Sequence, residues 1–81
     1  MDEATARVTA GLTQAMRAEV EGQSFYLMAA RTTTDDKGRA VFEQLANEEV
    51  SHFEFLKSQH RALAETGRAD PAIRLPAPGR L

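Results

Sequence analysis

Apolar residues recur at alternating steps of four and three along residues 4–32, with polar residues between them. This spacing predicts one long amphipathic helix whose apolar stripe faces a core. Its seam consists of Val8, Leu12, Ala15, Glu19, Gly22, Tyr26 and Ala29, widened by Met16, Phe25 and Ala30. Gly22 costs about 1 kcal/mol of helix propensity, and on the seam it allows a bulky group or a second helix to approach closely. Val20 and Leu27 fall outside the stripe, so we expect them on the outer face.

The same stepping returns along residues 37–66 and predicts a second helix. Its seam consists of Phe42, Leu45, Glu49, His52, Leu56, Gln59 and Leu63. Between the two helices, the run from Thr32 to Asp36 disfavours helix, and its aspartates are good N-caps for the second helix. Gly67 is a natural C-terminal stop, with Pro71 just beyond it. A short turn between two long helices implies an all-α fold, an antiparallel two-helix hairpin over residues 1–67.

Residues 68–81 carry three prolines and little periodicity, so we predict an extended tail there. Its apolar residues Ile73, Leu75 and Leu81 suit a short peptide that docks on a shell or another partner. The alternative is a loose terminus, or an arm packed on a neighbouring subunit.

Composition bounds the remaining choices. The chain has 81 residues, enough for one small domain, and no cysteine, which excludes disulfides, thiolate metal sites and thiol catalysis. A net charge of −2 gives no reason to expect nucleic acid or an anionic membrane surface as a partner. No apolar run approaches the roughly 18 residues of a membrane span, and the acidic start is unlike a signal peptide. We therefore expect a cytoplasmic protein with no membrane partner.

Two polar side chains interrupt the second seam. Glu49 and His52 are spaced i, i+3, so both project from the same face of the helix, among apolar neighbours. A carboxylate and an imidazole in an apolar seam are costly unless something pairs with them. A metal ion is the simplest partner for this combination, although a buried pair bonded to each other across a dimer is the alternative.

Counting from the turn places a third polar residue beside them. Glu19 lies 15 residues before Thr34 and Glu49 lies 15 residues after it, so both sit roughly 22 Å from the turn and face each other in an antiparallel hairpin. Two helices cannot cover so wide a stripe, so we expect a homodimer, or a higher even-numbered oligomer, in which two hairpins form a four-helix bundle. The four carboxylates of two Glu19 and two Glu49 would then be neutralised by two divalent metal ions.

At these residues the chain resembles the ferritin-like proteins. The segment from Glu19 to Tyr26 resembles their first metal-site helix, and Glu49-Val50-Ser51-His52 resembles their second. The surrounding residues 25–30 and 42–49 are most similar to the rubrerythrin branch. Those proteins normally carry both halves of the bundle in one chain, whereas a single hairpin resembles the encapsulated ferritins. Their site forms between two subunits and works inside a separate encapsulin shell.

The resemblance implies a ferroxidase that oxidises Fe(II) at a shared site with two iron ions per dimer, for iron storage or detoxification. Its metal ligands and catalytic residues would be Glu19, Glu49 and His52, and manganese or zinc are conceivable substitutes for iron. The Tyr26 hydroxyl would hydrogen-bond to a ligand. An encapsulin shell, bound through the C-terminal tail, would be a further partner.

Other functions and roles stay open at this point. One alternative function is a rubrerythrin-like, peroxide-scavenging di-iron protein, and another is a non-enzymatic helical module for assembly. Glu19 would be a solvated flank residue if a small rotation of its helix exposed it, and Tyr26 would alternatively be core packing. The acidic residues Glu48 and Glu21 border the seam and are either surface charges or residues that attract Fe(II) to the site. His60 is assigned to the surface or to packing.

Overall fold

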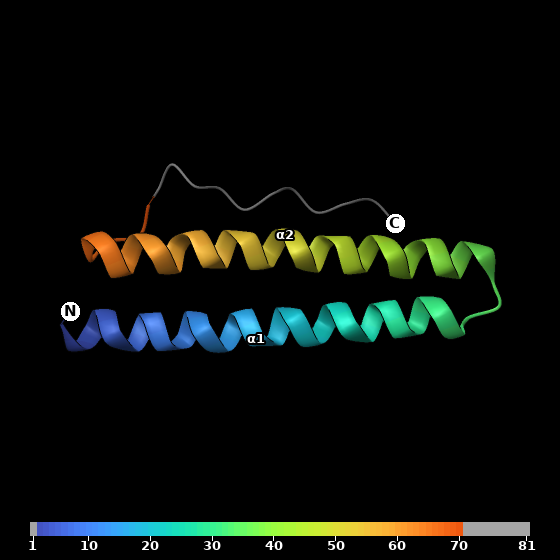
Figure 1. Cartoon of the computed structure of the whole chain (residues 1–81), viewed down its shortest axis with the longest axis horizontal. Helices are drawn as coiled ribbons and strands as arrows, with labels where there is room; N and C mark the ends of the chain where they lie inside the picture. The colour runs from blue at the N-terminus through green and yellow to red at the C-terminus, as the bar shows by residue number, and fades with distance from the viewer. Residues whose placement is uncertain (1, 71–81) are drawn as a thin grey trace.

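The computed structural model describes residues 2–70 and has two antiparallel helices side by side (Figure 1). Helix α1 spans Glu3–Thr32 and helix α2 spans Asp36–Thr66. The predicted helices, residues 4–32 and 37–66, each begin one residue later than the observed ones and end at the same residue. The all-α hairpin is therefore confirmed, and the predicted tail lies outside the described residues from Pro71 onward.

Local side chains fix where each helix begins and ends. Asp2 caps α1 by accepting a hydrogen bond from the Thr5 backbone N–H at 2.6 Å. Asp35 caps α2 by accepting bonds from the backbone N–H groups of Lys37 at 3.3 Å and Gly38 at 3.2 Å. At the other end of α2, Gly67 adopts φ 74°, a left-handed conformation that favours glycine, and donates to the Leu63 carbonyl.

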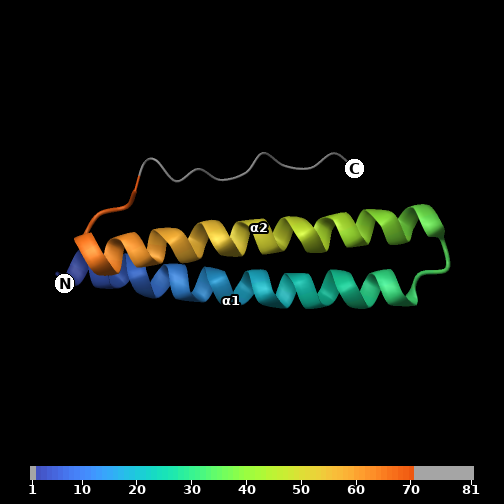
Figure 2. The same ribbon diagram turned by 45° about the horizontal axis from the view of Figure 1, so that its top comes forward.

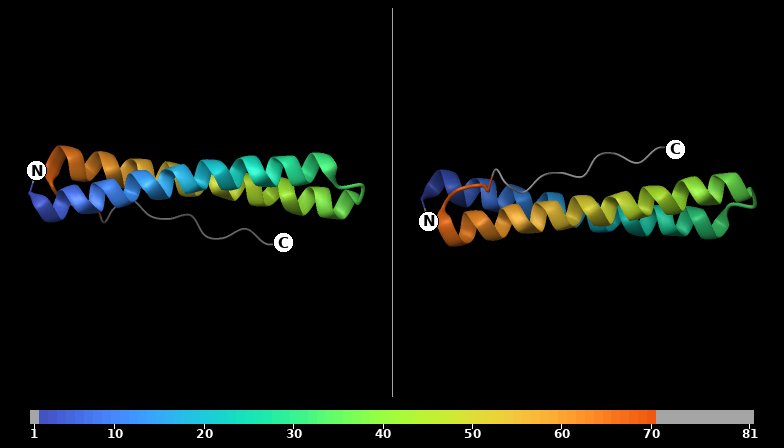
Figure 3. Two further views of the ribbon diagram at one scale, coloured as in Figure 1. Left: turned by 90° about the horizontal axis from the view of Figure 1, so that it is seen from below. Right: turned by 90° about the horizontal axis from the view of Figure 1, so that it is seen from above.

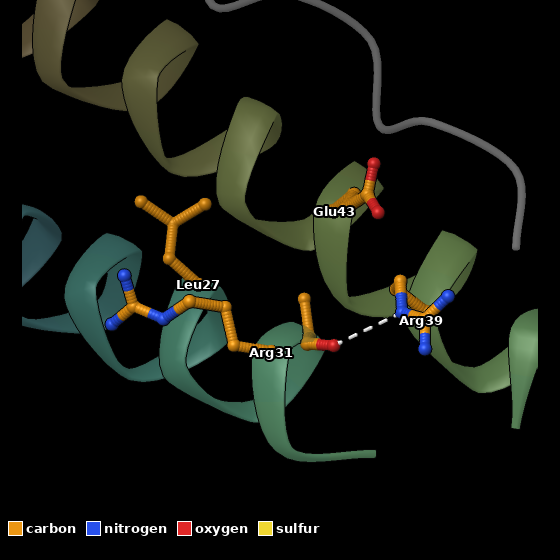
Figure 4. Close-up of a pocket in the computed structure, with 5 residues that line it drawn as sticks. Leu27, Arg31, Arg39 and Glu43 are labelled. Carbon is orange, nitrogen blue, oxygen red and sulfur yellow. Dashed lines mark hydrogen bonds between the residues drawn. The ribbon is translucent and has the colours of Figure 1, made fainter. Parts of the chain in front are cut away.

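Arg39 ties the two helices together at the turn. Its guanidinium donates to the backbone carbonyls of Ala30 at 3.3 Å and Thr33 at 3.2 Å, and it pairs with Asp36 at 3.1 Å. Figure 4 shows the bond to Ala30 beside a pocket of about 360 Å³ that Arg39 lines with Leu27, Arg31 and Glu43. Because the arginine satisfies carbonyls that the end of α1 leaves without helical partners, we assign its role to the turn.

The hairpin is one layer of helices. Its extents are 50 × 21 × 13 Å, and the shortest is close to the diameter of a single helix with side chains. Views from below and above show the same two ribbons with no further layer of described helix (Figure 3). Among the described residues, the buried ones are Ala30, Ala46, Gln59 and Leu63. Both broad faces of the hairpin are therefore open.

Many apolar side chains consequently remain accessible. The exposed large ones in the described chain are Val8, Val20, Phe25, Leu27, Met28 and Val50. The predicted outward position of Val20 and Leu27 is confirmed. Val8 and Phe25 belong to the predicted stripe, yet they are 52% and 60% exposed, because one hairpin has nothing to pack over them. Within the part of the chain that is described, neither helix is apolar enough over its length to cross a membrane.

A buried amide holds the residues that follow α2. The Gln59 side chain donates from Nε2 to the Asp70 carbonyl and accepts from the Asp70 N–H, both at 2.9 Å. The chain after Gly67 thus turns back along α2 (Figure 2). Gln59 was predicted only as a seam position, and its two bonds satisfy a polar group that is 9% exposed.

Replacing this amide tests how the turn after α2 is held. We expect Gln59→Leu to leave two backbone groups of Asp70 without their amide partner and to remove the protection of its N–H from hydrogen exchange, since each bond contributes about 1 kcal/mol. Amide exchange of Asp70 measures this. Gln44→Leu, the same change elsewhere on α2, is the control and should leave Asp70 protected. Undiminished protection in Gln59→Leu would show that other contacts hold the segment.

Candidate metal centre

The three predicted ligand residues meet near the middle of the hairpin. Glu19 comes from α1, and Glu49 and His52 come from adjacent turns of α2. Each offers one ligand atom, and these atoms all lie within 4.8 Å of one another. Equal distances from the turn therefore do bring Glu19 and Glu49 to one level, as counting along the sequence predicts.

The Glu19 carboxylate is the least satisfied group of this cluster. Its Oε2 atom is buried and has no hydrogen-bond partner within the described structure. The nearest opposite group is His52, whose Nδ1 lies 3.6 Å from that oxygen, beyond hydrogen-bond distance. A buried acceptor left without a partner costs about 1–3 kcal/mol. This oxygen thus has an unfilled requirement for a cation or a proton donor.

The surroundings of Glu49 favour the neutral form of its carboxyl group. The Glu19 carboxylate, with which it shares a proton, raises the pKa of Glu49 from 4.5 to about 7, and burial and the charge of Glu19 act in the same direction. The charge of His52 opposes this rise, and that of Glu48 adds to it. At pH 7, the Glu49 carboxyl is therefore protonated in about half of the molecules in the absence of a metal ion.

Gly22 makes room for the Glu49 side chain. A Cβ atom at residue 22 would lie 3.0 Å from Glu49 Oε2 and 3.3 Å from its Cδ. The carboxylate therefore rests directly on the backbone of α1. The prediction that the seam glycine admits a bulky group is confirmed, and the group it admits is itself one of the candidate ligands.

The donor set suits a hard or borderline metal ion. Two carboxylates and one imidazole are ligands that iron, manganese and zinc accept. The unsatisfied Glu19 oxygen and the proton shared with Glu49 are both features that a bound cation would resolve, because it would supply the missing partner and displace the proton. The residues present therefore fit a metal ion, while their binding of one stays a prediction.

The other residues predicted for the site differ in their exposure and contacts. Tyr26 is half-buried and its ring packs edge to face on Phe25, with centroids 5.5 Å apart. Glu48 is half-buried and accepts a 3.5 Å hydrogen bond from Gln44, whereas Glu21 is exposed. His60 is half-buried, in accord with a packing role. The metal-related roles of Tyr26, Glu48 and Glu21 stay predictions.

Two pockets adjoin the cluster. One, of about 190 Å³, is lined by Glu19, His52, Phe55 and Leu56. The other, of about 240 Å³, is lined by Glu19, Val20, Gln23, Glu49, Val50 and Phe53. Gln23 and Val50 were not predicted as part of the site. Their spacing from the ligands was the available signal, because Gln23 lies one turn beyond Glu19 and Val50 directly follows Glu49.

A family model described as Rubrerythrin matches residues 11–73, a stretch that contains every candidate ligand. The chain belongs to the rubrerythrin family. This confirms the resemblance found in the sequence, and it supports a di-iron, ferritin-like protein as the general class. No curated protein matches this member of the family. No solved structure matches it either.

The shared proton predicts how stability depends on pH. Because the pKa of Glu49 is raised from 4.5 to about 7 in the folded protein, its stabilising contribution is fully present below 4.5 and is lost as the pH rises through 7. Glu49→Gln imitates the protonated form and removes this dependence. We expect the Tm of the metal-free wild type to fall relative to that of Glu49→Gln over this range. Thermal unfolding followed by circular dichroism measures it, with Glu54→Gln on the same helix as the control. A pH-independent difference in Tm would contradict the shared proton.

The close contact at Gly22 predicts opposite changes in stability and in metal affinity. Gly22→Ala should stabilise α1 by up to about 1 kcal/mol, yet it should weaken metal binding roughly tenfold, because the new methyl group displaces the Glu49 carboxylate. Gly11→Ala is a matched control, since nothing lies within 4 Å of a Cβ atom there. Thermal unfolding and anaerobic Fe(II) titration measure the two quantities. Equal metal affinity in both variants would contradict a ligand role for Glu49 in the observed position.

Proposed function

We propose that this rubrerythrin-family hairpin is a di-iron ferroxidase, and that a second copy of the chain completes its site. The observation that carries the proposal is the meeting of Glu19, Glu49 and His52 at one level of the hairpin, with one buried carboxylate oxygen unsatisfied. A purely structural trio would have its polar atoms paired within the hairpin. A trio prepared for a metal ion keeps one ligand atom unpaired.

Two arguments support a second copy as the missing half. The hairpin is one helix thick and leaves stripe residues such as Val8 and Phe25 exposed, as half of a four-helix bundle does. Three ligand side chains are also too few to enclose two metal ions. In a two-fold dimer, the four carboxylates carry a charge of −4 that two divalent cations neutralise, so metal binding and association favour each other.

The side of the hairpin that the second copy covers is indicated by the seam of α2. Relative to Glu49, His52 and Gln59 lie on one flank of the helix, and Val50 and Phe53 lie on the other, at about 100° per residue. The polar seam positions His52 and Gln59 and the buried Leu63 lie on the His52 flank, whereas the buried Ala46 lies on the other. A bundle core built on that flank would bring both copies of His52 toward the common centre.

The reaction would use Fe(II) as its substrate. Each of two Fe(II) ions gives up one electron, and dioxygen accepts two electrons and two protons to form hydrogen peroxide. Glu19 and Glu49 would supply oxygen ligands and His52 a nitrogen ligand. Glu49 must release its proton when the metal ion binds, so binding should strengthen as the pH rises toward 7.

A rubrerythrin-like peroxide scavenger is the second candidate, and the family match favours it. The same residues would then hold the iron, and peroxide would accept two protons and two electrons to give two waters, with an external electron donor reducing the iron again. A helical module that only mediates assembly does not account for the unsatisfied carboxylate. Iron storage or detoxification, with docking of residues 68–81 on an encapsulin shell, belongs to the ferroxidase proposal. Most of that tail lies outside the described residues.

Metal-dependent assembly and oxidation test the proposal together. Native mass spectrometry during anaerobic Fe(II) titration should show a dimer with two metal ions, and air should then produce Fe(III) absorbance. Glu49→Ala should slow oxidation by more than the roughly 10- to 100-fold that loss of an outer partner costs. Glu54→Ala, an exposed glutamate on the same helix, is the control.

Three outcomes would decide against parts of this scheme. Absence of iron binding by the wild type, or equal rates in wild type and Glu49→Ala, would leave only the assembly module. A monomer that binds and oxidises iron fully would remove the shared site. Rapid turnover with peroxide but not with dioxygen would favour the scavenger.

A further inference from the structure

The carboxylates of the candidate site are reached from two opposite flanks of the hairpin. Glu19 lines both of the pockets beside the cluster. The pocket with His52 and Phe55 lies on the flank that the proposed second copy covers. Val50 and Phe53 lie on the opposite flank of α2 from His52, rotated by about 100° and 40° from Glu49 about the helix axis. We call the pocket on that side the outer pocket, lined by Val20, Gln23, Val50 and Phe53 with Glu19 and Glu49.

The outer pocket has an apolar rim. Val20 and Val50 are 47% and 40% exposed, one on each helix, and Phe53 lies one turn from Val50. Gln23 contributes a neutral amide, so among the described residues the two candidate ligands are the only charged groups that line the pocket. A hydrated cation entering here would lose water and gain only the Gln23 amide oxygen as a partner at the rim. A small neutral molecule would not incur that penalty.

The size of the pocket suits such a molecule. Its volume is about 240 Å³. A cavity of roughly 150 Å³ is already large enough to hold benzene, so the pocket has room for a molecule as small as dioxygen. The rim is formed by valines and a phenylalanine, with one amide. It therefore favours an apolar gas over a hydrogen-bonding oxidant.

We propose that the outer pocket is the route by which dioxygen reaches the metal site, through the flank of the hairpin that faces away from the second copy. This inference rests on the proposed function. It assigns Val20 and Val50 as the residues that control access of the oxidant, whereas the metal ions enter from elsewhere. Substitutions at the rim should therefore act on the oxidant and leave Fe(II) binding unchanged.

A measurement on the metal-free protein tests the route without catalysis. Dissolved dioxygen is paramagnetic and speeds the relaxation of nearby methyl groups. Under oxygen pressure, the methyl resonances of Val20 and Val50 should relax severalfold faster than that of Met28, which is 53% exposed and does not line the pocket. Relaxation that tracks exposure alone, and is greatest at Met28, would overturn the proposal.

A pair of substitutions tests the route during turnover. Val50→Phe should fill the pocket and raise the KM for dioxygen severalfold, with Fe(II) affinity in anaerobic titration unchanged. Val50→Ala should widen the pocket and lower that KM. Leu27→Phe is the matched control, because Leu27 is 42% exposed and lies outside the pocket. If both Val50 variants oxidise iron with the oxygen dependence of the wild type, the route is wrong even though the ferroxidase stands. If the wild type binds no iron, the proposed function fails, and the relaxation result still decides whether dioxygen enters here.

Discussion

The close approach of two carboxylates from different helices is the constraint on which this hairpin is built. Glu19 and Glu49 meet beside His52 at one level, and a single proton between them relieves their repulsion only in part. The rest of the local structure accommodates that pair. Gly22 removes the side chain that would occupy the space of the Glu49 carboxylate. Burial of the Glu19 oxygen without a partner then leaves an unmet electrostatic demand at the centre of the molecule.

The thinness of the hairpin determines from which side a partner for the Glu19 oxygen would have to come. Because the hairpin is one helix thick, its described chain places no further helix over the cluster on either broad face (Figure 3). The apolar residues that remain exposed, Phe25 and Val8 among them, are costly in the same way. One event, association with another copy around metal ions, would relieve both costs. That coupling would explain why acidic and apolar positions share a single seam without separating into a site and a core.

Most of the fold was predictable because its determinants are local. The stepping of apolar residues gives the helices, and Asp35 and Gly67 mark their ends through bonds to their own neighbours. The meeting of Glu19 and Glu49 was predictable by counting, since helical rise is constant. The two hydrogen bonds between the Gln59 side chain and Asp70 were not predictable from the sequence. Their partners are the backbone N–H and carbonyl of Asp70, which almost any residue type would offer. The outer pocket was missed for a related reason. Its shape depends on how far the helices separate beside Gln23 and Val50, which periodicity does not specify.

The short turn between α1 and α2 also sets how the chain is able to change in length. Residues inserted into one helix between the turn and the cluster would slide Glu19 past Glu49 by about 1.5 Å each and rotate it by about 100°. Only matched insertions in both arms, in steps near seven residues, would restore the facing pair. Insertions beyond the cluster, toward the two chain ends, would not change the register of Glu19 and Glu49. The helix segments between the turn and the cluster are therefore fixed in length, whereas the segments beyond the cluster are able to vary.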